Sequence, residues 1–254
     1  MKILVFDTET TGLPEKDASI YDFEKWPYII QISAILYDLS TNQTTIYDNY
    51  IKIDNSIIIP PESYKIHKLT HEFLNKNGIH IIPALREFNN LLYKCDIVIG
   101  HNISFDKKLV FVECLRHKIR QYFTQFRGKQ QIRKSEYCTM RKTTNVCKLT
   151  AISKRTGKPF RKTPSLLELY MFLFPESDLP KDLHNSLVDI LITFRCYMKL
   201  EYDTDIIEIN EKTKKLFIEY NCISKPLENI KDEIMAEMEN FRLLEKEDPY
   251  LNVK

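Results

Sequence analysis

The first twelve residues place two carboxylates directly after a short apolar segment. Residues 3–6 are Ile-Leu-Val-Phe, a composition that favours a buried strand. Because side chains alternate along a strand, Asp7 and Glu9 share one face where the strand leaves the core. Two such anions repel each other unless a proton or a cation compensates them, and a divalent metal suits carboxylate oxygens. The ordinary alternative is a strand that ends in a polar turn over residues 10–12.

The remaining pattern predicts an α/β domain. Three strands, followed by helices that alternate with strands, indicate a sheet with helices packed against it and active groups near the strand ends. Pro83 is expected at the first position of its helix, and Ser165 with Glu168 has the spacing of a capping box. The expected strands cover 3–6, 29–37, 44–53, 96–100 and 137–140, and the expected helices cover 64–75, 83–94, 105–119, 165–174 and 186–200.

Length and composition favour an intracellular protein of one domain with an appendage. The chain has 254 residues, and 43% of them are hydrophobic, which is enough for a full core. Its six cysteines are scattered without a CxxC pair, so neither a zinc site nor a disulfide framework is indicated. No segment approaches the about 20 apolar residues of a membrane span or resembles a signal peptide. We therefore expect the cytoplasm or the nucleus, with no secretion and no membrane partner.

Charge is distributed very unevenly along the chain. Residues 116–162 contain fifteen Lys and Arg but one acid, Glu136, whereas residues 201–254 contain fourteen acids and eight bases. The basic segment predicts a polyanionic partner, although a basic loop without a specific ligand is the alternative. Five aromatic residues interleaved with it suit stacking on bases: Tyr122, Phe123, Phe126, Tyr137 and Phe160.

Two further carboxylates are expected near the first pair. Asp106 begins a helix directly after a buried strand, although an acid there also favours the helix dipole. Asp189 belongs to a helix that is apolar nearly all round, so its charge requires compensation, which a metal shared with Asp7 would provide. His184 lies near Asp189 if it belongs to the preceding loop and Asn185 caps the helix. Histidine titrates near neutrality and therefore suits a general base.

Three segments together carry a resemblance to a known family. They are Asp7-Thr-Glu9-Thr-Thr-Gly-Leu13, His101-Asn-Ile-Ser-Phe-Asp106 and His184-Asn-Ser-Leu-Val-Asp189. In this order they resemble the exonuclease motifs of the DnaQ-like DEDD family of 3′→5′ exonucleases, in its histidine subclass. Residues 29–32 and 66–70 are similar to further family segments. The resemblance implies a ribonuclease H-like fold over residues 1–200, with a mixed central sheet, helices on both faces and a basic insertion at about 116–162. Residues 201–254 would form an acidic helical extension.

The resemblance also implies a mechanism and a set of site residues. Two Mg²⁺ or Mn²⁺ ions would be held by Asp7, Glu9, Asp106 and Asp189, and His184 would take a proton from the attacking water. The enzyme would release nucleoside 5′-monophosphates from a single-stranded or frayed 3′ end, with DNA favoured. Lys68 and Ser186 replace a frequent glycine and a frequent alanine of the family. The residues expected to hold the terminal nucleotide are Thr10, Leu13, His67 and Asn102.

The charge of the basic segment predicts that some of its residues bind backbone phosphates upstream of the 3′ end. These residues are Lys154, Arg155, Arg161 and Lys162.

Three alternatives stay open from the sequence. The same chemistry could trim RNA 3′ ends, since recognition of the 2′-hydroxyl depends on a few atoms. A non-catalytic nucleic-acid-binding module would be expected to have lost a carboxylate or the histidine, and all five are present. A proofreading subunit could bind a replication or repair partner through a C-terminal apolar stripe, which could equally pack on its own domain. The stripe consists of Leu227, Ile230, Ile234, Met238, Phe241 and Leu244.

Overall fold

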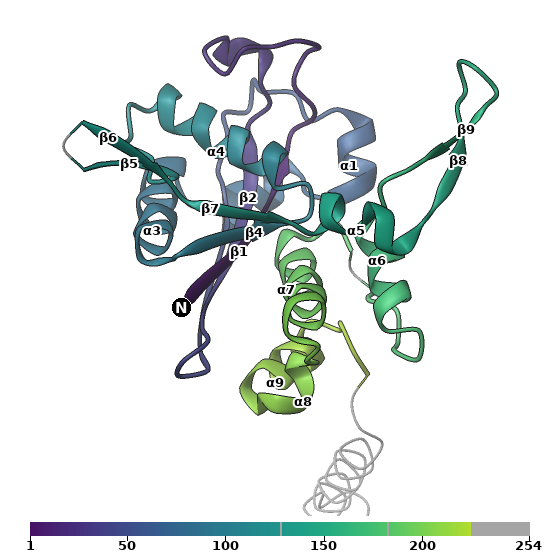
Figure 1. Ribbon diagram of the computed structural model, residues 1–254. Helices are drawn as coiled ribbons and strands as arrows, with labels where there is room; N and C mark the ends of the chain where they lie inside the picture. The colour runs from purple at the N-terminus through teal and green to yellow at the C-terminus, as the bar shows by residue number, and fades with distance from the viewer. Residues whose placement is uncertain (128, 182, 225–254) are drawn as a thin grey trace, which may run out of the picture. The chain divides into compact units, whose positions relative to one another are not determined.

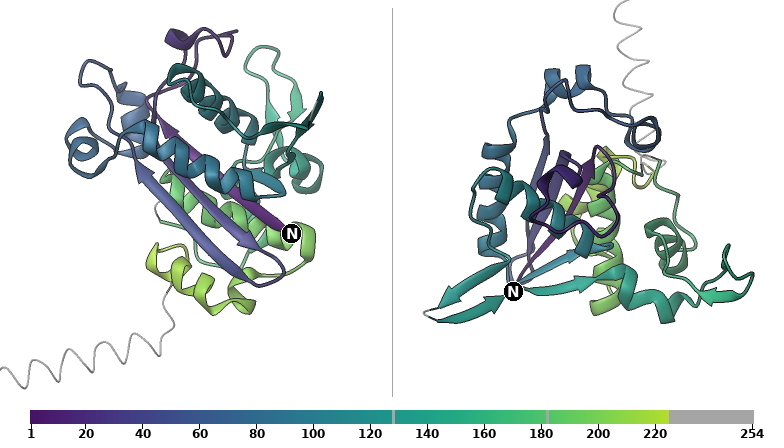
Figure 2. Two further views of the ribbon diagram at one scale, coloured as in Figure 1. Left: turned by 90° about the vertical axis from the view of Figure 1, so that its left-hand side faces the viewer. Right: turned by 90° about the horizontal axis from the view of Figure 1, so that it is seen from above.

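A mixed sheet of five strands lies at the centre of the structure, with the order β3-β2-β1-β4-β7 (Figure 1). Strands β1, β2 and β3 pair antiparallel, whereas β4 is parallel to β1 and β7 is parallel to β4. Helices cover both faces, so the predicted α/β architecture is confirmed (Figure 2). The strands are β1 (Lys2–Thr10), β2 (Ile29–Asp38), β3 (Gln43–Tyr50), β4 (Ile97–Gly100) and β7 (Ser135–Cys138).

This computed structural model describes residues 1–127, 129–181 and 183–224, without the side chains of 125–127. Residues Met1–Cys222 form one compact unit, which includes the short helices α8 (Ile206–Ile209) and α9 (Glu211–Glu219). The apolar stripe predicted over 227–244 lies outside the described residues. Within the described part, no helix combines the length and the hydrophobicity that a membrane crossing requires.

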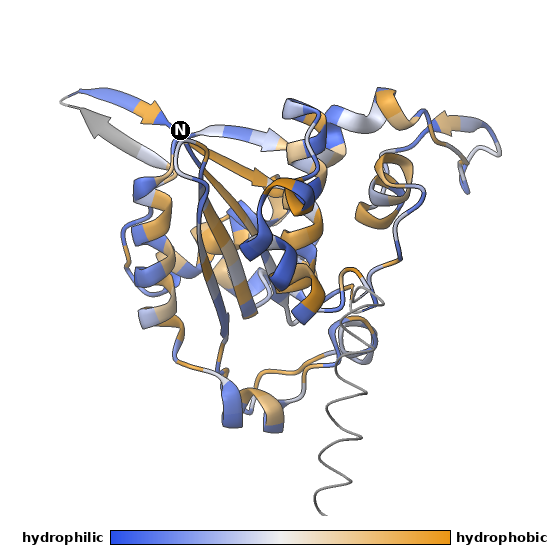
Figure 3. Ribbon diagram, turned by 90° about the horizontal axis from the view of Figure 1, so that it is seen from below, coloured by the Kyte–Doolittle hydropathy of each residue, from blue (hydrophilic) through white to orange (hydrophobic). Residues whose placement is uncertain are grey.

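The sheet is buried because helices pack against both of its faces. Residues 3–6 of β1 are at most 1% exposed, and the central strands are hydrophobic over most of their length (Figure 3). Helices α3 (Ile81–Lys94) and α4 (Ile103–Arg116) lie on one face, and α7 (Ser186–Tyr202) lies on the other (Figure 2). A four-residue apolar run thus becomes the central strand of a two-sided core.

Helix α7 is buried along most of its length because a second layer covers its outer side. This layer contains α5 (Thr139–Cys147), α6 (Leu166–Leu173) and α8. The buried Arg195 of α7 joins the layers, since its guanidinium binds both carboxylate oxygens of Asp205 at 2.9 and 2.6 Å and the Tyr170 hydroxyl at 2.5 Å. A buried cation of this kind is stable only when it is paired, and here Asp205 supplies the pair.

The helix predicted over 64–75 is wrong, because two short helices occupy this region. Helix α1 (Pro61–His67) ends where Lys68 adopts a left-handed conformation with φ of 60°. Helix α2 (His71–Asn77) begins after Thr70, whose side chain accepts a hydrogen bond from the Phe73 amide at 3.1 Å. A capping threonine so close to a left-handed residue favours a new helix over continuation of the first.

The predicted first-position role of Pro83 is also wrong. Helix α3 begins at Ile81, which makes Pro83 its third residue. This position is tolerated because amides in the first helical turn have no intrahelical acceptor, so the missing N–H of proline costs little there.

The basic segment contains more structure than the single strand predicted for it. Besides β7, it forms a hairpin of β5 (Thr124–Arg127) with β6 (Gln130–Arg133), helix α5, and a hairpin of β8 (Thr150–Ile152) with β9 (Pro159–Arg161). The two hairpins project on opposite sides of the sheet (Figure 1). The predicted stacking role is wrong for Phe123 and Tyr137, which are 1% and 8% exposed, whereas Phe160 is 49% exposed. The side chain of Phe126 lies outside the described atoms.

Some of the basic residues stabilise the fold. Arg116 closes the loop that contains a short 3-10 helix, Phe23–Lys25. Its guanidinium donates to the carbonyl oxygens of Phe23 and Trp26, each at 2.5 Å, and pairs with Glu113 at 2.7 Å. The ammonium group of Lys134 donates to the Cys95 carbonyl. These charges therefore have partners within the protein, and the segment presents fewer free cations than its composition suggests.

The predicted capping box of α6 is confirmed, and its contribution to stability can be measured. Ser165 Oγ accepts from the Glu168 amide at 3.2 Å, and Glu168 Oε2 accepts from the Ser165 amide at 2.8 Å. Ser165→Ala should lower the free energy of unfolding by about 1 kcal/mol in urea denaturation, because one helix N–H loses its acceptor. In Glu168→Gln the glutamine can still accept the hydrogen bond from the Ser165 amide, but the ion pair with Lys162 is lost. This change should lower the free energy of unfolding by about 0–1 kcal/mol. An unchanged urea midpoint for Ser165→Ala would contradict the role of the cap.

Candidate active site

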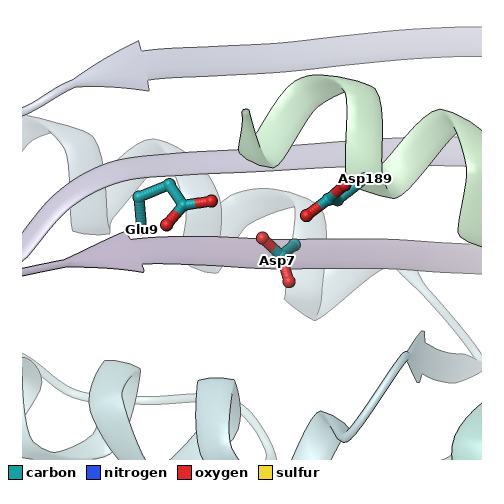
Figure 4. Close-up of side chains that lie close together, drawn as sticks. All are labelled: Asp7, Glu9 and Asp189. Atoms are coloured by element: carbon teal, nitrogen blue, oxygen red, sulfur yellow. The ribbon is translucent and has the colours of Figure 1, made fainter. Parts of the chain in front are cut away.

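Three carboxylates from two elements meet at the carboxyl end of β1. Asp7 and Glu9 lie on β1, and Asp189 lies in the first turn of α7 (Figure 4). Each contributes one oxygen to a group in which all of these atoms are within 4.8 Å of one another. The alternation of β1 directs both of its acids toward α7, so the structure brings together three of the four predicted metal ligands in one group.

Helix α7 is attached to β1 directly beside these acids. The Ser186 hydroxyl donates to the main-chain oxygen of Asp7 at 2.9 Å. Asn185 caps the helix, as predicted, by accepting from the Leu187 amide at 3.0 Å. The serine that replaces a frequent alanine of the family thus forms a bond that alanine cannot form, and it joins the segment of Asp189 to that of Asp7.

Gln31 of β2 is a further residue of this region that sequence reasoning missed. Its side chain is 1% exposed, and its amide nitrogen donates to Asp48 at 2.9 Å and to Asn185 Oδ1 at 3.2 Å. Its oxygen accepts from the Ser186 amide at 3.3 Å. The sequence contained one indication of this role, a glutamine within a mostly apolar strand. A buried side-chain amide requires hydrogen-bond partners, so such a residue indicates polar contacts inside the fold.

Asp106 lies in the first turn of α4 and is 3% exposed. Its Oδ1 accepts from the amide and the hydroxyl of Thr8, at 3.2 and 2.8 Å. Asp106 is outside the three-carboxylate group, but its negative charge acts on both Asp7 and Asp189. The fourth predicted ligand therefore adjoins the other three through Thr8, which lies between Asp7 and Glu9 in β1.

Burial raises the pKa of all four carboxyl groups, and repulsion from neighbouring acids raises it further for Asp7, Glu9 and Asp189. The pKa of Asp7 rises well above its ordinary value, mainly through burial and then through the charges of Asp106, Asp189 and Glu9. Burial, with Asp189 and Asp106 next, raises the pKa of Glu9 to about 9. Burial is also the main cause that raises the pKa of Asp106 and of Asp189 to about 7.

No lysine or arginine among the described residues forms an ion pair with these four acids. One buried and three half-buried carboxylates, which have no cationic side chain beside them and offer only oxygen atoms as ligands, fit a divalent cation that would neutralise them. The donor set thus suits the metal that the sequence predicted.

His184 directly precedes the cap of α7 and has a left-handed backbone with φ of 70°. Its side chain is exposed, and its amide donates to Asp189 Oδ1 at 3.4 Å. The histidine therefore lies in a loop, and a backbone bond links this loop to one of the clustered acids. An exposed imidazole in this place is accessible to water and to substrate.

A pocket of about 420 Å³ adjoins Glu9. It contains two of the predicted nucleotide-binding residues of the β1 end: Thr10, whose hydroxyl donates to the Gly12 carbonyl at 2.7 Å, and Leu13, which is 82% exposed. Asn102 is the left-handed residue before α4, and it is not among the residues that line this pocket. The lining residues are Thr8, Glu9, Thr10, Gly12, Leu13, Pro60, Glu62, Ser63, Ile66, His67 and Phe105.

His67 contributes a polar group to this pocket. Its Nδ1 accepts from the Leu69 amide at 3.0 Å, while its buried Nε2 has no hydrogen-bond partner among the described residues. Burial lowers the pKa of His67 to about 4, so the ring is neutral near pH 7. Because Nδ1 accepts, Nε2 carries the proton. His67 thus lines the pocket and carries an N–H donor that has no partner among the described residues.

The four predicted phosphate-binding residues lie in and beside the β8–β9 hairpin, away from the carboxylates. Lys154, Arg155 and Arg161 are exposed, whereas Lys162 pairs with Glu168 at 2.6 Å. The end of the hairpin is attached near the site through His101, the residue before Asn102. The ring nitrogens of His101 lie 2.9 Å from the Thr139 hydroxyl and 3.1 Å from the Pro164 carbonyl oxygen.

Comparison with known proteins identifies the class of this fold and site. The family model RNase_T, described as Exonuclease, matches residues 4–197. The match covers well over half of the chain, so the protein belongs to this exonuclease family. The family depends on a divalent metal, in agreement with the carboxylate group at the end of β1. No curated protein matches the chain in sequence.

Solved structures of Exonuclease I have the same fold. The complex of E. coli Exonuclease I with a dT13 oligonucleotide has a TM-score of 0.57 at 14% identity, over 83% of this chain and 43% of that chain. Exonuclease I from Methylocaldum szegediense has a TM-score of 0.57 at 15% identity, over 86% of this chain and 45% of that one. A zinc-bound E. coli ExoI–ssDNA complex has a TM-score of 0.56 at 15% identity, over 85% of this chain and 42% of that one. The chain thus corresponds to less than half of these proteins.

The raised pKa values predict how stability depends on pH without metal. A carboxyl whose folded pKa is raised binds protons in the folded state that it lacks in the unfolded state, so stability falls as pH rises from about 4 through the folded pKa. In EDTA, Asp189→Asn should therefore melt at the same temperature as the wild type near pH 4 and higher at pH 8. The expected difference is on the order of 1 kcal/mol or more, or about 2–4 °C.

Asp203→Asn is the matched control for this experiment. Asp203 is exposed, and its hydrogen bond with Lys199 lowers the pKa of its carboxyl, so its replacement should give no gain that grows with pH. A melting-temperature advantage of Asp189→Asn that is the same at every pH would contradict the electrostatic origin.

Proposed function

We propose that this protein is a metal-dependent 3′→5′ exonuclease that hydrolyses nucleic acid, with DNA favoured, to nucleoside 5′-monophosphates. The observation that carries the proposal is the group of Asp7, Glu9 and Asp189 beside the buried Asp106, in a member of the exonuclease family. Four acids that repel each other at one strand end are unfavourable for a structural role alone. Their arrangement is consistent with a binding site for cations that take part in phosphodiester hydrolysis.

Asp7, Glu9, Asp106 and Asp189 would hold two Mg²⁺ or Mn²⁺ ions. Such ions, when bound, supply Lewis-acid stabilisation of the charge that develops on the phosphate oxygens. The Ser186–Asp7 bond and the Thr8–Asp106 bonds keep the ligand-bearing segments in register. Gln31 performs the same task for the start of α7, because a shift of this helix would break two hydrogen bonds, to Asn185 and Ser186.

His184 would act as the general base that takes the proton from the attacking water. Its exposed side chain and its position one residue before the α7 cap support this role. The hydrogen bond from its backbone amide to Asp189 Oδ1 limits how far the loop can move. A proton acceptor must lie within hydrogen-bond reach of the water in the substrate complex, and an exposed loop residue can meet this condition.

The pocket beside Glu9 would receive the 3′-terminal nucleotide. Leu13, Ile66 and Phe105 provide apolar surface for a base or sugar, and the His67 Nε2–H group would donate to a sugar or phosphate oxygen. Thr10 belongs to the same pocket, and Asn102 would contact the nucleotide from the start of α4. The exposed cations Lys154, Arg155 and Arg161, with Lys162, would contact phosphates farther from the 3′ end.

The choice of DNA over RNA rests on the structural neighbours. E. coli Exonuclease I is described in complexes with dT13 and dA16 oligonucleotides, which supports single-stranded DNA, or a frayed 3′ end, as the substrate. RNA 3′-end trimming is the alternative, since the same carboxylate chemistry applies to it. A replication or repair partner would bind the C-terminal stripe, which lies outside the described residues.

The proposed activity can be tested with 5′-labelled ssDNA, dsDNA and RNA of one sequence in Mg²⁺ or Mn²⁺. The wild type should shorten ssDNA stepwise from the 3′ end, and EDTA should stop the reaction. Asp7→Asn should reduce turnover by on the order of 10³-fold or more, because bound metal supplies several kcal/mol of transition-state stabilisation. Asp54→Asn, an exposed acid bonded to Ser56, is the control with the same change of charge. Faster degradation of RNA would support the alternative, and full activity in EDTA would refute the metal site.

The role of His184 predicts a separation between catalysis and binding. His184→Ala should lower kcat by about 10²–10⁴-fold, the usual contribution of a general base, while the affinity for ssDNA measured in EDTA stays the same. The dependence of kcat on pH near neutrality should disappear in this variant. His80→Ala, which removes another exposed histidine, should behave like the wild type. An unchanged pH profile in His184→Ala would assign proton removal to another group.

A further inference from the structure

The structure contains a second pocket that shares no lining residue with the pocket beside Glu9. Its volume is about 300 Å³, at the lower end of the range for ligand pockets. The 14–27 loop, α4 and the β5–β6 hairpin form its walls. It is called the α4–β6 pocket below, and its lining residues are Ile20, Lys107, Lys108, Phe111, Thr124, Gln131 and Arg133.

The α4–β6 pocket carries positive charge that no described residue compensates. Lys107 forms an ion pair with Glu136. Lys108 and Arg133 are exposed and form no ion pair with any described residue. In this they differ from Arg116, which pairs with Glu113, and from Lys134, which donates to a main-chain carbonyl. Two such charges at one pocket favour an anionic ligand.

The pocket combines these cations with an aromatic surface. Phe111 is half-buried in its wall and stacks on the buried Phe123, with ring centroids 6.0 Å apart and an interplanar angle of 17°. The Lys107 ammonium lies 5.8 Å from the Phe123 ring centroid. Surfaces that bind single-stranded nucleic acid typically pair a cationic path for the backbone with aromatic side chains. A free inorganic anion would not require the aromatic part.

The position of the pocket places it within reach of a strand bound at the carboxylates. Lys107 and Lys108 directly follow Asp106 in α4. At a helical rise of 1.5 Å per residue, Phe111 lies about 7.5 Å from Asp106 along the helix axis. The β8–β9 hairpin projects on the opposite side of the sheet (Figure 1). The basic segment therefore supplies cations to two separate surfaces.

We propose that the α4–β6 pocket is a second phosphate-binding subsite, which holds the phosphodiester backbone of the nucleic-acid substrate through Lys108 and Arg133. The proposal rests on the proposed function for the identity of the polyanion. The phosphates could belong to the strand that is cleaved or to its complementary strand, and the chemistry of recognition is the same for both.

The test measures binding without cleavage, by fluorescence anisotropy in EDTA over a range of salt concentrations. Three labelled probes are compared: ssDNA of about 6 nucleotides, ssDNA of about 30 nucleotides, and a duplex with a 3′ overhang. The variant Lys108→Gln/Arg133→Gln removes two cations from the pocket. Lys212→Gln/Lys215→Gln removes two exposed cations from α9 and is the matched control.

We expect the pocket variant to bind more weakly than the control, with a lower salt dependence. Loss of two phosphate contacts should reduce the slope of log Kd against log salt by about 1.4 for ssDNA or about 1.8 for duplex. A reduction on long ssDNA assigns the pocket to the cleaved strand, and a reduction on the duplex alone assigns it to the complementary strand. Equal slopes for the pocket variant, the control and the wild type on every probe would overturn the proposal.

A separate assay distinguishes failure of this proposal from failure of the proposed function. Cleavage of the short ssDNA by the wild type in Mg²⁺ tests the proposed function by itself, because this assay alters no residue of the pocket. If the wild type cleaves the short probe but the salt slopes are equal, only the subsite is wrong. A further variant, with Lys154, Arg155, Arg161 and Lys162 changed to Gln, should lower the slope additively with the pocket variant, since the two surfaces are separate.

Discussion

The repulsion among four carboxylates, of which Asp106 is buried and the other three are half-buried, is the constraint on which the rest of this structure depends. Asp7, Glu9 and Asp189 share one group of oxygens, and Asp106 adds its charge from α4. Such an arrangement opposes folding unless protons or cations neutralise it, and no described lysine or arginine does so. The apolar packing on both faces of β1 provides the free energy that holds the acids in place. Without a cation the four acids therefore lower the stability of the fold, and the same repulsion favours the binding of a divalent metal.

Hydrogen bonds in the same region fix the positions of the segments that carry the four acids. Gln31, Asn185 and Ser186 connect β2, the start of α7 and the backbone of Asp7, while Thr8 connects β1 to Asp106. Each bond joins segments that are far apart in the sequence, and the bonds of Ser186 and Thr8 join segments that carry different acids. Side chains that are locked by buried partners lose little freedom when a ligand binds, which is the condition for a pre-organised site.

Basic residues have two distinct roles in this chain, and the amino-acid composition does not show which residue has which role. Arg195 is buried and Arg116 is half-buried, and both bind carbonyl groups or carboxylates of the protein, so they stabilise the fold. Lys108, Arg133 and the cations of the β8–β9 hairpin remain at the surface and are available to a polyanion. The difference is one of solvation, because a buried guanidinium must be paired, whereas an exposed cation retains its water until a phosphate replaces it.

The sequence by itself determined the elements whose cause is local. The apolar run before Asp7, the capping box at Ser165 and the cap at Asn185 depend on neighbours within a few residues, so periodicity and spacing predicted them. Tertiary structure decided the break at Lys68, the burial of Phe123 and Tyr137, the role of Gln31 and the division of the basic segment into two hairpins. These features depend on contacts between residues that are distant in the chain. Local propensity carries no information about such partners, because only the folded sheet and its helices bring them together.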